Sequence, residues 1–151
     1  MIKKQTAWAL LLCPLFLAAC PASSPGATHQ VPGGFSTITA AIAAASSGDT
    51  IRVTAGTYSP AANSETFPLR LDVELYLLGA GAESCTLDAA STDHVLLTTN
   101  PAGGRISGFT ITGGFAVRGS GIWVKAGNIE IDRNMIRGNA AMSQGATPVS
   151  K

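Results

Sequence analysis

The sequence is poor in charge, in cysteine and in the short motifs that hold metals or cofactors. Charged residues make up 13% of the 151-residue chain, and ten basic side chains are nearly balanced by nine acidic ones. A protein that binds nucleic acid or an anionic membrane surface through its overall charge shows a basic excess. The charge balance therefore predicts no nucleic-acid partner.

Motifs for catalysis and cofactor binding are also missing. The sequence contains neither paired Cys-x-x-Cys nor His-Glu-x-x-His, the spacings typical of zinc sites. It has no serine nucleophile elbow of the form Gly-x-Ser-x-Gly. The segment Gly79-Ala80-Gly81 predicts a tight turn rather than a dinucleotide-binding loop, because no helix with a third glycine follows it. We therefore predict no cofactor and no metal site.

Residues 1–19 have the features of a signal peptide. Lys3 and Lys4 supply the charged start, and the following apolar run is shorter than the roughly 20 residues of a transmembrane helix. The sequence Leu17-Ala18-Ala19-Cys20 resembles a bacterial lipoprotein box. The resemblance implies that Cys20 carries acyl chains such as palmitate, which anchor the protein to a membrane. An ordinary signal peptide that happens to end in cysteine is the alternative.

Export and lipidation would leave one free cysteine. Cys13 leaves with the signal and Cys20 carries lipid, so Cys85 is alone and no disulfide is expected. Loss of the two lysines of the signal changes the formal charge from +1 to −1. In lipoproteins of this kind an aspartate after the modified cysteine is associated with inner-membrane retention, and Pro21 stands there instead. We therefore expect a location in the cell envelope, at the outer membrane.

The composition changes several times along the exported part. Residues 20–34 are rich in Pro, Ala, Ser and Gly and predict a flexible tether. In residues 35–48, Ile38 and Ile42 recur at helical spacing, which predicts a short helix. Residues 49–140 predict many short strands, and residues 141–151 form a polar tail.

Alternation of apolar and polar residues marks the strands. The alternation is clearest in Pro68–Gly79, where one face holds Leu69, Leu71, Val73, Leu75 and Leu77. Shorter runs predict strands at Thr86–Asp88, His94–Thr98, Ile106–Thr112, Ile122–Lys125 and Ile129–Ile131. Seventeen glycines are consistent with a chain that turns often.

One segment of nine residues returns 25 residues later. ISGFTITGG, which begins at Ile106, aligns without a gap on IDRNMIRGN, which begins at Ile131. A repeat of this length made of short strands is typical of solenoids, whose turns bury their apolar faces only by stacking. The sequence thus predicts an all-β fold, a parallel β-helix of about three to four turns, capped by the helix in residues 35–48. The next turn would be due near residue 156, so we expect a truncated carboxyl-terminal end.

Asn134 lies where the inward pattern between Ile131 and Ile136 changes phase, which is what a corner between two sheets produces. An inward asparagine at a corner can bond backbone groups that the bend leaves unpaired, and stacked asparagines form ladders. We therefore assign Asn134 to a structural ladder rather than to catalysis.

Two segments resemble a known family. STITAAIAAASSGDTIRVTAGTYS and FPLRLDVELYLLGAG are similar to the start of right-handed, single-stranded parallel β-helix proteins of the pectin-lyase-like superfamily. The similarity is greatest to the bacterial family known as domain of unknown function 1565. It covers Phe35 to Gly81 and implies the right-handed β-helix with its capping helix. Enzymes of the superfamily carry their catalytic residues on central turns, and no residue of this chain matches those motifs. No catalytic residue is therefore predicted.

The best candidate for a functional surface lies on the last two strands. With the isoleucines of these strands inward, four side chains must face outward: Trp123, Lys125, Glu130 and Asp132. An exposed indole can pack on a sugar ring, and neighbouring charges can bind hydroxyls, a uronate or a cation. The alternatives are a solvated sheet face with Trp123 under a loop, and a glycosidase whose two carboxylates are Glu130 and Asp132.

Two further residues could take part in chemistry, but each has a simpler interpretation. His94 follows Asp93 at a turn, which is more typical of a surface pair than of a catalytic base. Cys85 begins a strand in phase with Leu87, which predicts a small buried residue rather than a nucleophile.

Together these features predict a lipid-anchored envelope domain that contacts polysaccharide and is not an enzyme. The expected partners are the membrane, through Cys20, and a polysaccharide. One alternative is a truncated polysaccharide-active enzyme, a lyase, hydrolase or pectin-esterase-like protein, that lacks its catalytic turns. A second alternative is a structural or adhesive stalk.

Overall fold

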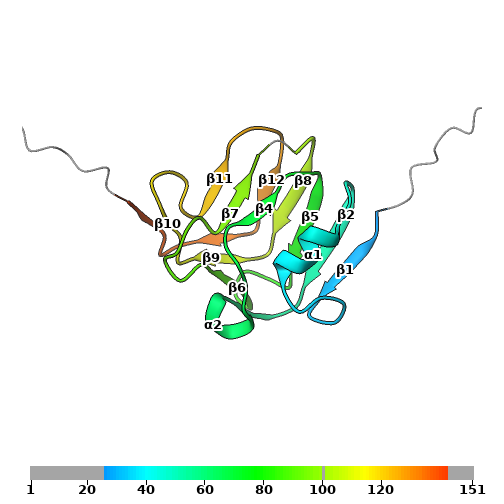
Figure 1. Ribbon diagram of the computed structural model, residues 1–151, viewed down its shortest axis with the longest axis horizontal. Helices are drawn as coiled ribbons and strands as arrows, with labels where there is room; N and C mark the ends of the chain where they lie inside the picture. The colour runs from blue at the N-terminus through cyan, green and yellow to red at the C-terminus, as the bar shows by residue number, and fades with distance from the viewer. Residues whose placement is uncertain (1–25, 100, 143–151) are drawn as a thin grey trace, which may run out of the picture.

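The computed structural model describes residues 26–99 and 101–142 (Figure 1). This part of the chain forms fourteen short strands and two short helices. The predicted signal peptide, the lipidation residue Cys20 and most of the predicted polar tail lie outside the described residues. Among the described residues, no helix has the length and apolar character that a membrane span requires.

The strands form three main parallel sheets and one short pair. Sheet A contains β1 (Thr28–Val31), β2 (Asp49–Val53), β5 (Leu75–Gly79), β8 (Gly104–Ser107) and β12 (Glu130–Asp132). Sheet B contains β3 (Gly56–Tyr58), β6 (Cys85–Asp88), β9 (Thr110–Thr112) and β13 (Met135–Ile136). Sheet C contains β4 (Leu69–Leu71), β7 (Leu96–Thr98) and β11 (Ile122–Val124), and β10 (Phe115–Ala116) pairs with β14 (Ala140–Ala141).

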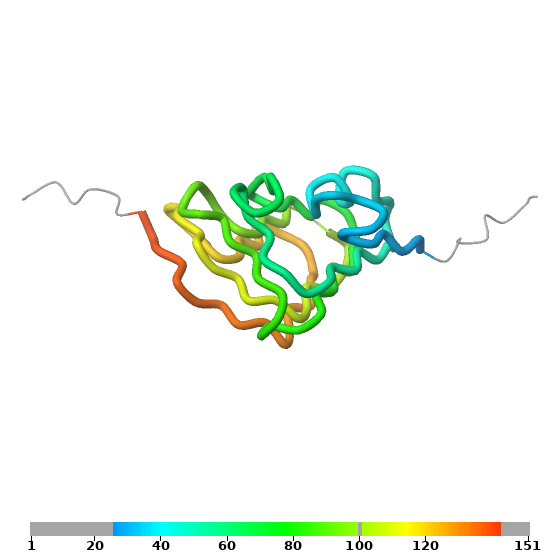
Figure 2. The backbone as a smooth tube through the Cα atoms, turned by 90° about the horizontal axis from the view of Figure 1, so that it is seen from below, coloured from blue at the N-terminus to red at the C-terminus, as the bar shows by residue number. Residues whose placement is uncertain are grey.

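From β2 to β13 the chain visits sheets A, B and C in a repeating order, with β10 of the short pair between β9 and β11. Equivalent strands of successive turns then pair in parallel, for example β2 with β5 and β5 with β8. The result is a β-solenoid of about four turns, which confirms the predicted parallel β-helix. The amino-terminal strands and the last described strands lie at opposite ends of the molecule (Figure 2).

The repeat found in the sequence sets the register between two turns. Ile131 pairs with Ile106 between β12 and β8, and Ile136 pairs with Ile111 between β13 and β9. Ile106 and Ile111 are fully buried, whereas Ile131 and Ile136 are 39% and 54% exposed. The later pair is exposed because no described strand packs on its far side. The predicted stacking is therefore present, but its last layer is open.

The core is a column of aliphatic side chains inside the solenoid. Each sheet contributes its inward residues at every second position, as the alternation predicted. The fully buried members include Ile51, Leu69, Leu71, Leu75, Leu77, Leu87, Leu96, Ile106, Phe109 and Ile111.

Helix α1 (Ile38–Ala44) closes the amino-terminal end of this column, as predicted. Ile38 and Ala41 are fully buried, and Ile42 packs against the core. The side chain of Thr37 caps the helix by accepting a hydrogen bond from the amide of Ala40 at 3.0 Å. The second helix, α2 (Pro60–Asn63), is a single turn in the connection between β3 and β4.

Part of the predicted tether belongs to the folded domain. Residues 28–31, which we expected within a flexible segment, form strand β1 and pair with β2 at the edge of sheet A. Val31 at its end is fully buried in the core. The surrounding Pro, Gly and Ser residues conceal this strand in the sequence, because only its last residue is aliphatic.

Val73 is the one misplaced member of the long alternating segment. The prediction placed it inward with Leu71 and Leu75, but its side chain is 42% exposed. The segment is two strands rather than one, since β4 belongs to sheet C and β5 to sheet A. Val73 lies at the corner between them, and the inward alternation resumes beyond it.

Asn134 lies at the corner between β12 and β13. Its Oδ1 accepts a hydrogen bond from the amide of Phe109 at 3.0 Å, and its Nδ2 donates to the carbonyl of Ile106 at 2.8 Å. Both partners belong to the preceding turn, where Phe109 rather than an asparagine occupies the equivalent position. Asn134 therefore joins two turns through backbone groups, and no second asparagine stacks beneath it.

Candidate functional site

The four side chains of the predicted surface lie on two different sheets. Trp123 and Lys125 lie on and just after β11 of sheet C, whereas Glu130 and Asp132 lie on β12 of sheet A. A corner at residues 125–129 separates the two strands. The structure therefore brings Trp123 together with Lys125 and brings Glu130 together with Asp132, but it does not join the two pairs in one surface.

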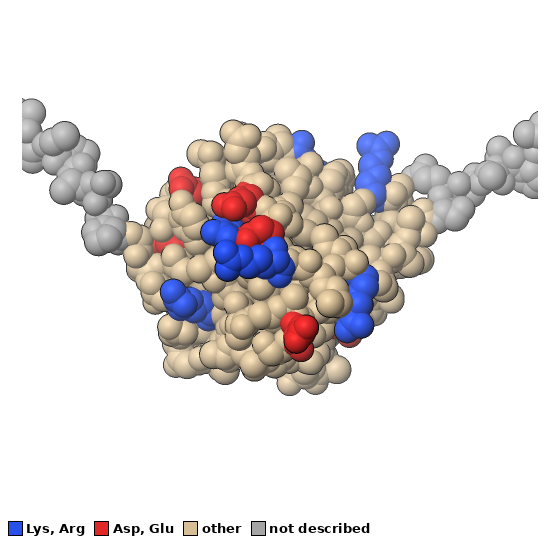
Figure 3. Space-filling model, turned by 180° about the vertical axis from the view of Figure 1, so that it is seen from behind, with Lys and Arg blue, Asp and Glu red and all other residues tan. Residues whose placement is uncertain are grey.

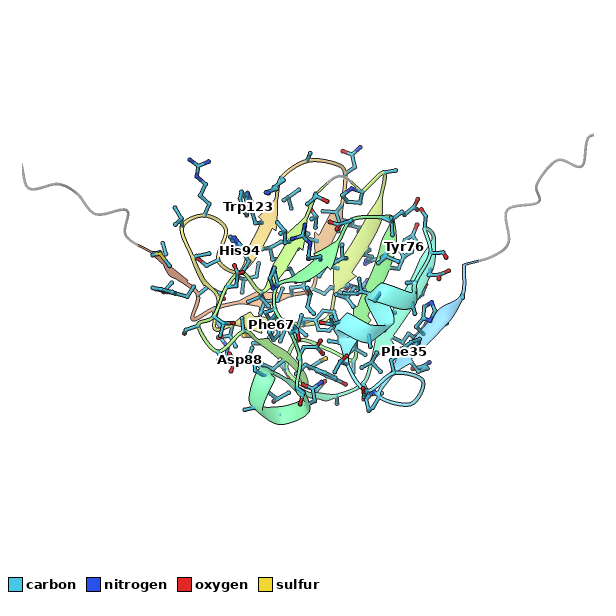
Figure 4. All side chains as sticks on the ribbon, viewed as in Figure 1. Phe35, Phe67, Tyr76, Asp88, His94 and Trp123 are labelled. Carbon is cyan, nitrogen blue, oxygen red and sulfur yellow. The ribbon has the colours of Figure 1, made fainter. Side chains whose placement is uncertain are left out.

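Trp123 is half-buried on the outer face of sheet C and has two polar neighbours. The Nζ atom of Lys125 lies over its ring, 4.6 Å from the centroid. The imidazole of His94 lies against the indole, with 4.8 Å between ring centroids and 40° between ring planes. Figure 4 shows His94 and Trp123 side by side, far from Phe35 and Tyr76. Cation–π and ring contacts of this kind hold the indole in one orientation.

His94 is held in place by the turn that precedes β11. Its Nδ1 lies 3.1 Å from the carbonyl oxygen of Gly119. A carbonyl only accepts hydrogen bonds, so Nδ1 carries the proton and donates it. The Nε2 atom lies 3.7 Å from Oδ1 of Asp93, beyond hydrogen-bond distance. His94 is 9% exposed, so the geometry fits a supporting residue behind Trp123.

An open cavity of about 560 Å³ lies beside Trp123. Its apolar wall contains aromatic and methionine side chains, and its polar wall contains charged and hydroxyl groups. Binding sites for small organic ligands combine an apolar surface with a few polar groups in this way. The residues that define it are Asp93, His94, Phe115, Arg118, Trp123 and Met142.

On sheet A, Asp132 is bound by arginine on two sides. The guanidinium of Arg105 donates to both of its carboxylate oxygens, from Nε at 2.8 Å and from Nη2 at 2.6 Å. Nε of Arg133 lies 3.2 Å from the same carboxylate. The hydrogen bonds from Arg105 are the largest cause that lowers the pKa of Asp132, and they raise the pKa of Arg105 in turn.

This ion pair argues against the glycosidase interpretation of Glu130 and Asp132. A glycosidase needs one carboxyl group whose raised pKa keeps it protonated as a general acid. The pKa of Asp132 is lowered, and its oxygens already accept hydrogen bonds from Arg105. Glu130 is 63% exposed at its side chain and lies 3.9 Å from the same guanidinium.

Cys85 and the glycine turn fit their structural interpretations. Cys85 is fully buried at the start of β6, and burial raises the pKa of its thiol to about 11. The thiolate that a nucleophile needs is therefore scarce at neutral pH. Gly81 has φ of 144° in the connection between β5 and β6, which is a tight turn rather than the start of a helix.

Two buried acidic residues escaped the sequence analysis. The carboxylate of Glu65, 2% exposed, accepts from the amides of Ile38 at 2.7 Å and Thr39 at 2.8 Å and thus caps helix α1. Asp49, the first residue of β2, accepts hydrogen bonds from Ala27 and His29 at β1 and from Ser46 just before β2. These bonds hold β1 against β2. Apart from Ser46, these partners lie 20 or more residues away in the sequence, so no local pattern could reveal them.

A second cavity, of about 520 Å³, lies between helix α1 and the β4–β5 corner. Its lining is mainly apolar and includes Ile42, Phe67 and Val73, with the ion pair of Arg70 and Asp72 at 3.6 Å on its edge. Within the described residues, no group of three or more His, Cys, Asp or Glu side chains is placed to bind a metal ion.

One known protein family matches the amino-terminal half of the described domain. Residues 22–90 match the family model described as Protein of unknown function (DUF1565). The match confirms the resemblance carried by the capping helix and the strands up to Gly81. The DUF1565 segment thus contains α1 and the strands from β1 to β6.

The Trp123 cavity and the ion pair of Asp132 both lie beyond the DUF1565 segment, so the family match says nothing of either. No curated protein and no solved structure matches the chain significantly.

Proposed function

We propose that this protein is an envelope domain, anchored by lipid on Cys20, that binds a saccharide in the cavity beside Trp123. The observation that carries the proposal is the pairing of a fixed, half-exposed indole with charged side chains around an open cavity. An indole offers the flat apolar surface on which the C–H groups of a sugar ring pack. Arg118 and Asp93 on the cavity wall supply partners for hydroxyl or carboxylate groups.

Lys125 can move away from the ring of Trp123 when a ligand binds. Its side chain is exposed, and its contact with Trp123 is a cation–π interaction on a flexible stem. A bound sugar can take the place of the ammonium group over the ring, and the displaced Nζ then meets the sugar's polar edge. His94 lies behind the indole and holds its orientation while Lys125 moves.

Two of the three side chains best suited to catalysis support binding without turnover. Asp132 is neutralised by arginine and lies on another sheet from Trp123. Cys85 is buried and protonated. His94 is the remaining candidate base in the cavity: its Nδ1 donates to the carbonyl of Gly119, which leaves Nε2 as the acceptor, and the turnover test therefore targets His94.

The proposal predicts that Trp123→Ala weakens glycan binding about fivefold, since an aromatic packing contact contributes on the order of 1 kcal/mol. Calorimetric titration with soluble neutral and acidic polysaccharides measures the affinity. Tyr76→Ala is the matched control, because Tyr76 is a half-exposed aromatic residue on the outer face of sheet A. Equal affinities for the parent protein and Trp123→Ala would contradict the site.

The same titrations test the absence of turnover. Reducing ends or unsaturated products should not accumulate during long incubation with the polysaccharides that bind. If product is released, and if His94→Gln abolishes the release, the protein is an enzyme and the binding proposal is wrong.

The lipid anchor has its own test, because Cys20 and its neighbours lie outside the described residues. We expect the exported protein to enter the detergent phase on phase separation, since several acyl chains on one residue give stable membrane attachment. The Cys20→Ser variant should stay in the aqueous phase. An unchanged distribution of that variant would refute the anchor but leave the saccharide site untouched.

A further inference from the structure

The chain enters the described fold beside the second cavity, the one of about 520 Å³ between helix α1 and the β4–β5 corner. The backbone of Gly26 lies against the carbonyl oxygen of Gly48. The amide of Gly48 donates a hydrogen bond to the carbonyl of Glu74 at 2.8 Å. Glu74 lies between Val73 and Leu75, which both line the cavity. Because neighbouring backbone segments of a sheet are about 4.8 Å apart, the entry point is roughly 10 Å from the cavity.

The lining of this cavity is mainly apolar. Ile42 and Phe67 pack against the core, and Val73 is 42% exposed. Within the described part of the chain, the lining has two charged members, Arg70 and Asp72, and Nε of the first lies 3.6 Å from Oδ2 of the second. The cavity is therefore balanced in charge and suits hydrocarbon better than a charged or hydroxyl-rich ligand.

Helix α1 presents an uncharged face beside the cavity. Its exposed residues are Ala40, Ala43 and Ala44, and no residue of the helix is charged. A helix on the surface of a protein in water ordinarily carries charged and polar residues on its outer face. Helix α1 lies at the front in Figure 1, whereas Figure 3 shows the opposite face, on which basic and acidic side chains gather near the middle. The uncharged helix and this charged cluster thus lie on opposite faces.

The proposed lipid anchor keeps the amino-terminal end of the domain close to a membrane. Cys20 precedes Gly26 by six residues. Six residues span at most about 20 Å even when they are fully extended. The cavity lies beside the entry of the chain, so it is among the first surfaces of the domain that the bilayer meets.

We propose that the cavity between α1 and the β4–β5 corner is a membrane-docking surface, which contacts the phospholipid bilayer that holds the acyl chains of Cys20. The inference depends on the lipid anchor proposed above. Phe67 and Val73 contact the acyl region, and the alanine face of α1 lies at the interface with no charge to desolvate. Arg70 lays its apolar stem along the cavity and offers its guanidinium to lipid phosphates.

Docking in this way orients the saccharide cavity. The last described strands lie at the opposite end of the molecule from the amino-terminal strands (Figure 2), and the Trp123 cavity includes Met142 from that end. A domain that rests on the bilayer through α1 therefore turns the Trp123 cavity away from the membrane.

A fluorescent label at residue 73 tests the docking. The full chain with Val73→Cys is exported, lipidated, labelled with a nitrobenzoxadiazole reagent and reconstituted in vesicles of phosphatidylethanolamine and phosphatidylglycerol. The matched control is Val117→Cys, because Val117 is also 42% exposed and follows β10 near the other end of the domain. Lipids with a spin label on the acyl chain should quench the label at residue 73 several-fold more strongly than the label at residue 117.

A charge on α1 should break the docking. Ala43→Glu in the Val73→Cys protein should reduce the quenching to the level at residue 117, because a buried carboxylate is costly in hydrocarbon. The protein should stay on the vesicles, since the acyl chains of Cys20 still hold it. Ala61→Glu is the control, because Ala61 is an exposed alanine of α2 outside the cavity lining. It should leave the quenching unchanged.

The parent protein, treated with the same reagent, separates failure of the anchor from failure of the docking. Cys85 is buried and the pKa of its thiol is raised to about 11, so it should not react. A label on Cys20 would refute the anchor and the docking with it. With the parent unlabelled, three results overturn the docking alone. These are equal quenching at residues 73 and 117, no effect of Ala43→Glu, and quenching at residue 73 only at high protein density, which would place a second copy over the cavity.

Discussion

The carboxylate of Asp49 ties the amino-terminal strand to the first turn of the solenoid. It accepts hydrogen bonds from the amide of Ala27 at 2.7 Å, the amide of Ser46 at 2.8 Å and Nε2 of His29 at 2.9 Å. The hydrogen bond from His29 is the largest cause that lowers the pKa of Asp49, followed by the two backbone amides. All three partners bind the charged form of the carboxylate.

This lowered pKa predicts how stability depends on pH. The folded protein binds the Asp49 proton more weakly than the unfolded chain does, so its contribution is full above the ordinary pKa near 3.8. The contribution is lost as the pH falls through the lower pKa of the folded state. Urea unfolding at pH 7 and at successively lower pH should therefore show a steeper acid loss in the parent protein than in Asp49→Asn. Identical pH profiles would refute this role.

Single residues also show where sequence reasoning stops. Arg105 and Asp132 are 27 residues apart, and their contact exists only because β8 and β12 are neighbours in sheet A. The sequence placed Asp132 on an outer face, which is correct, but it could not name the facing residue. The phase of a strand can be read from its own residues, whereas its cross-strand partners depend on the register of another turn.

At the scale of elements, helix α1 depends on a residue from a distant loop. Glu65 binds the amides of Ile38 and Thr39 and also the hydroxyl of Thr39, at 2.6 Å. These amides are among the first N–H groups of the helix, which have no partner within the helix itself. A carboxylate at this position also interacts favourably with the helix dipole.

Removal of this cap should destabilise the end of the solenoid. Glu65→Ala leaves buried amides without a partner, and we expect it to lower the free energy of unfolding by roughly 1–3 kcal/mol. Chemical denaturation followed by circular dichroism measures the change. The matched control is Glu83→Ala, which removes an exposed glutamate and should change stability little. A loss of similar size in both variants would show that Glu65 has no special role.

The elements themselves were predictable to different degrees. The helix and the strands with clear alternation were found because their periods are visible within a few residues. The corner at Val73 was missed because β4 and β5 are in phase across it, so one long strand and two short ones give the same pattern. Strand β1 was missed because its polar residues owe their position to pairing with β2 rather than to burial.

At the scale of the whole molecule, the solenoid leaves its outer faces as the surfaces on which a ligand could bind. The interior is filled by stacked aliphatic residues, so it leaves no room for a ligand. The outward residues of successive turns form continuous surfaces, and the open cavity beside Trp123 lies on that of sheet C. The 25-residue repeat predicted this architecture. It could not predict that the corner after β11 would divide the predicted functional surface.

The emission of Trp123 during titration with polysaccharide tests the central claim most directly. The chain has two tryptophans, and Trp8 lies in the predicted signal peptide, so Trp123 is the only one in the exported protein. We predict that a polysaccharide that binds shifts the emission of Trp123 to shorter wavelength as the sugar displaces water and Lys125 from the indole. The shift should saturate at the affinity that calorimetry gives. Calorimetric binding with no change in the emission of Trp123 would contradict the proposed saccharide site.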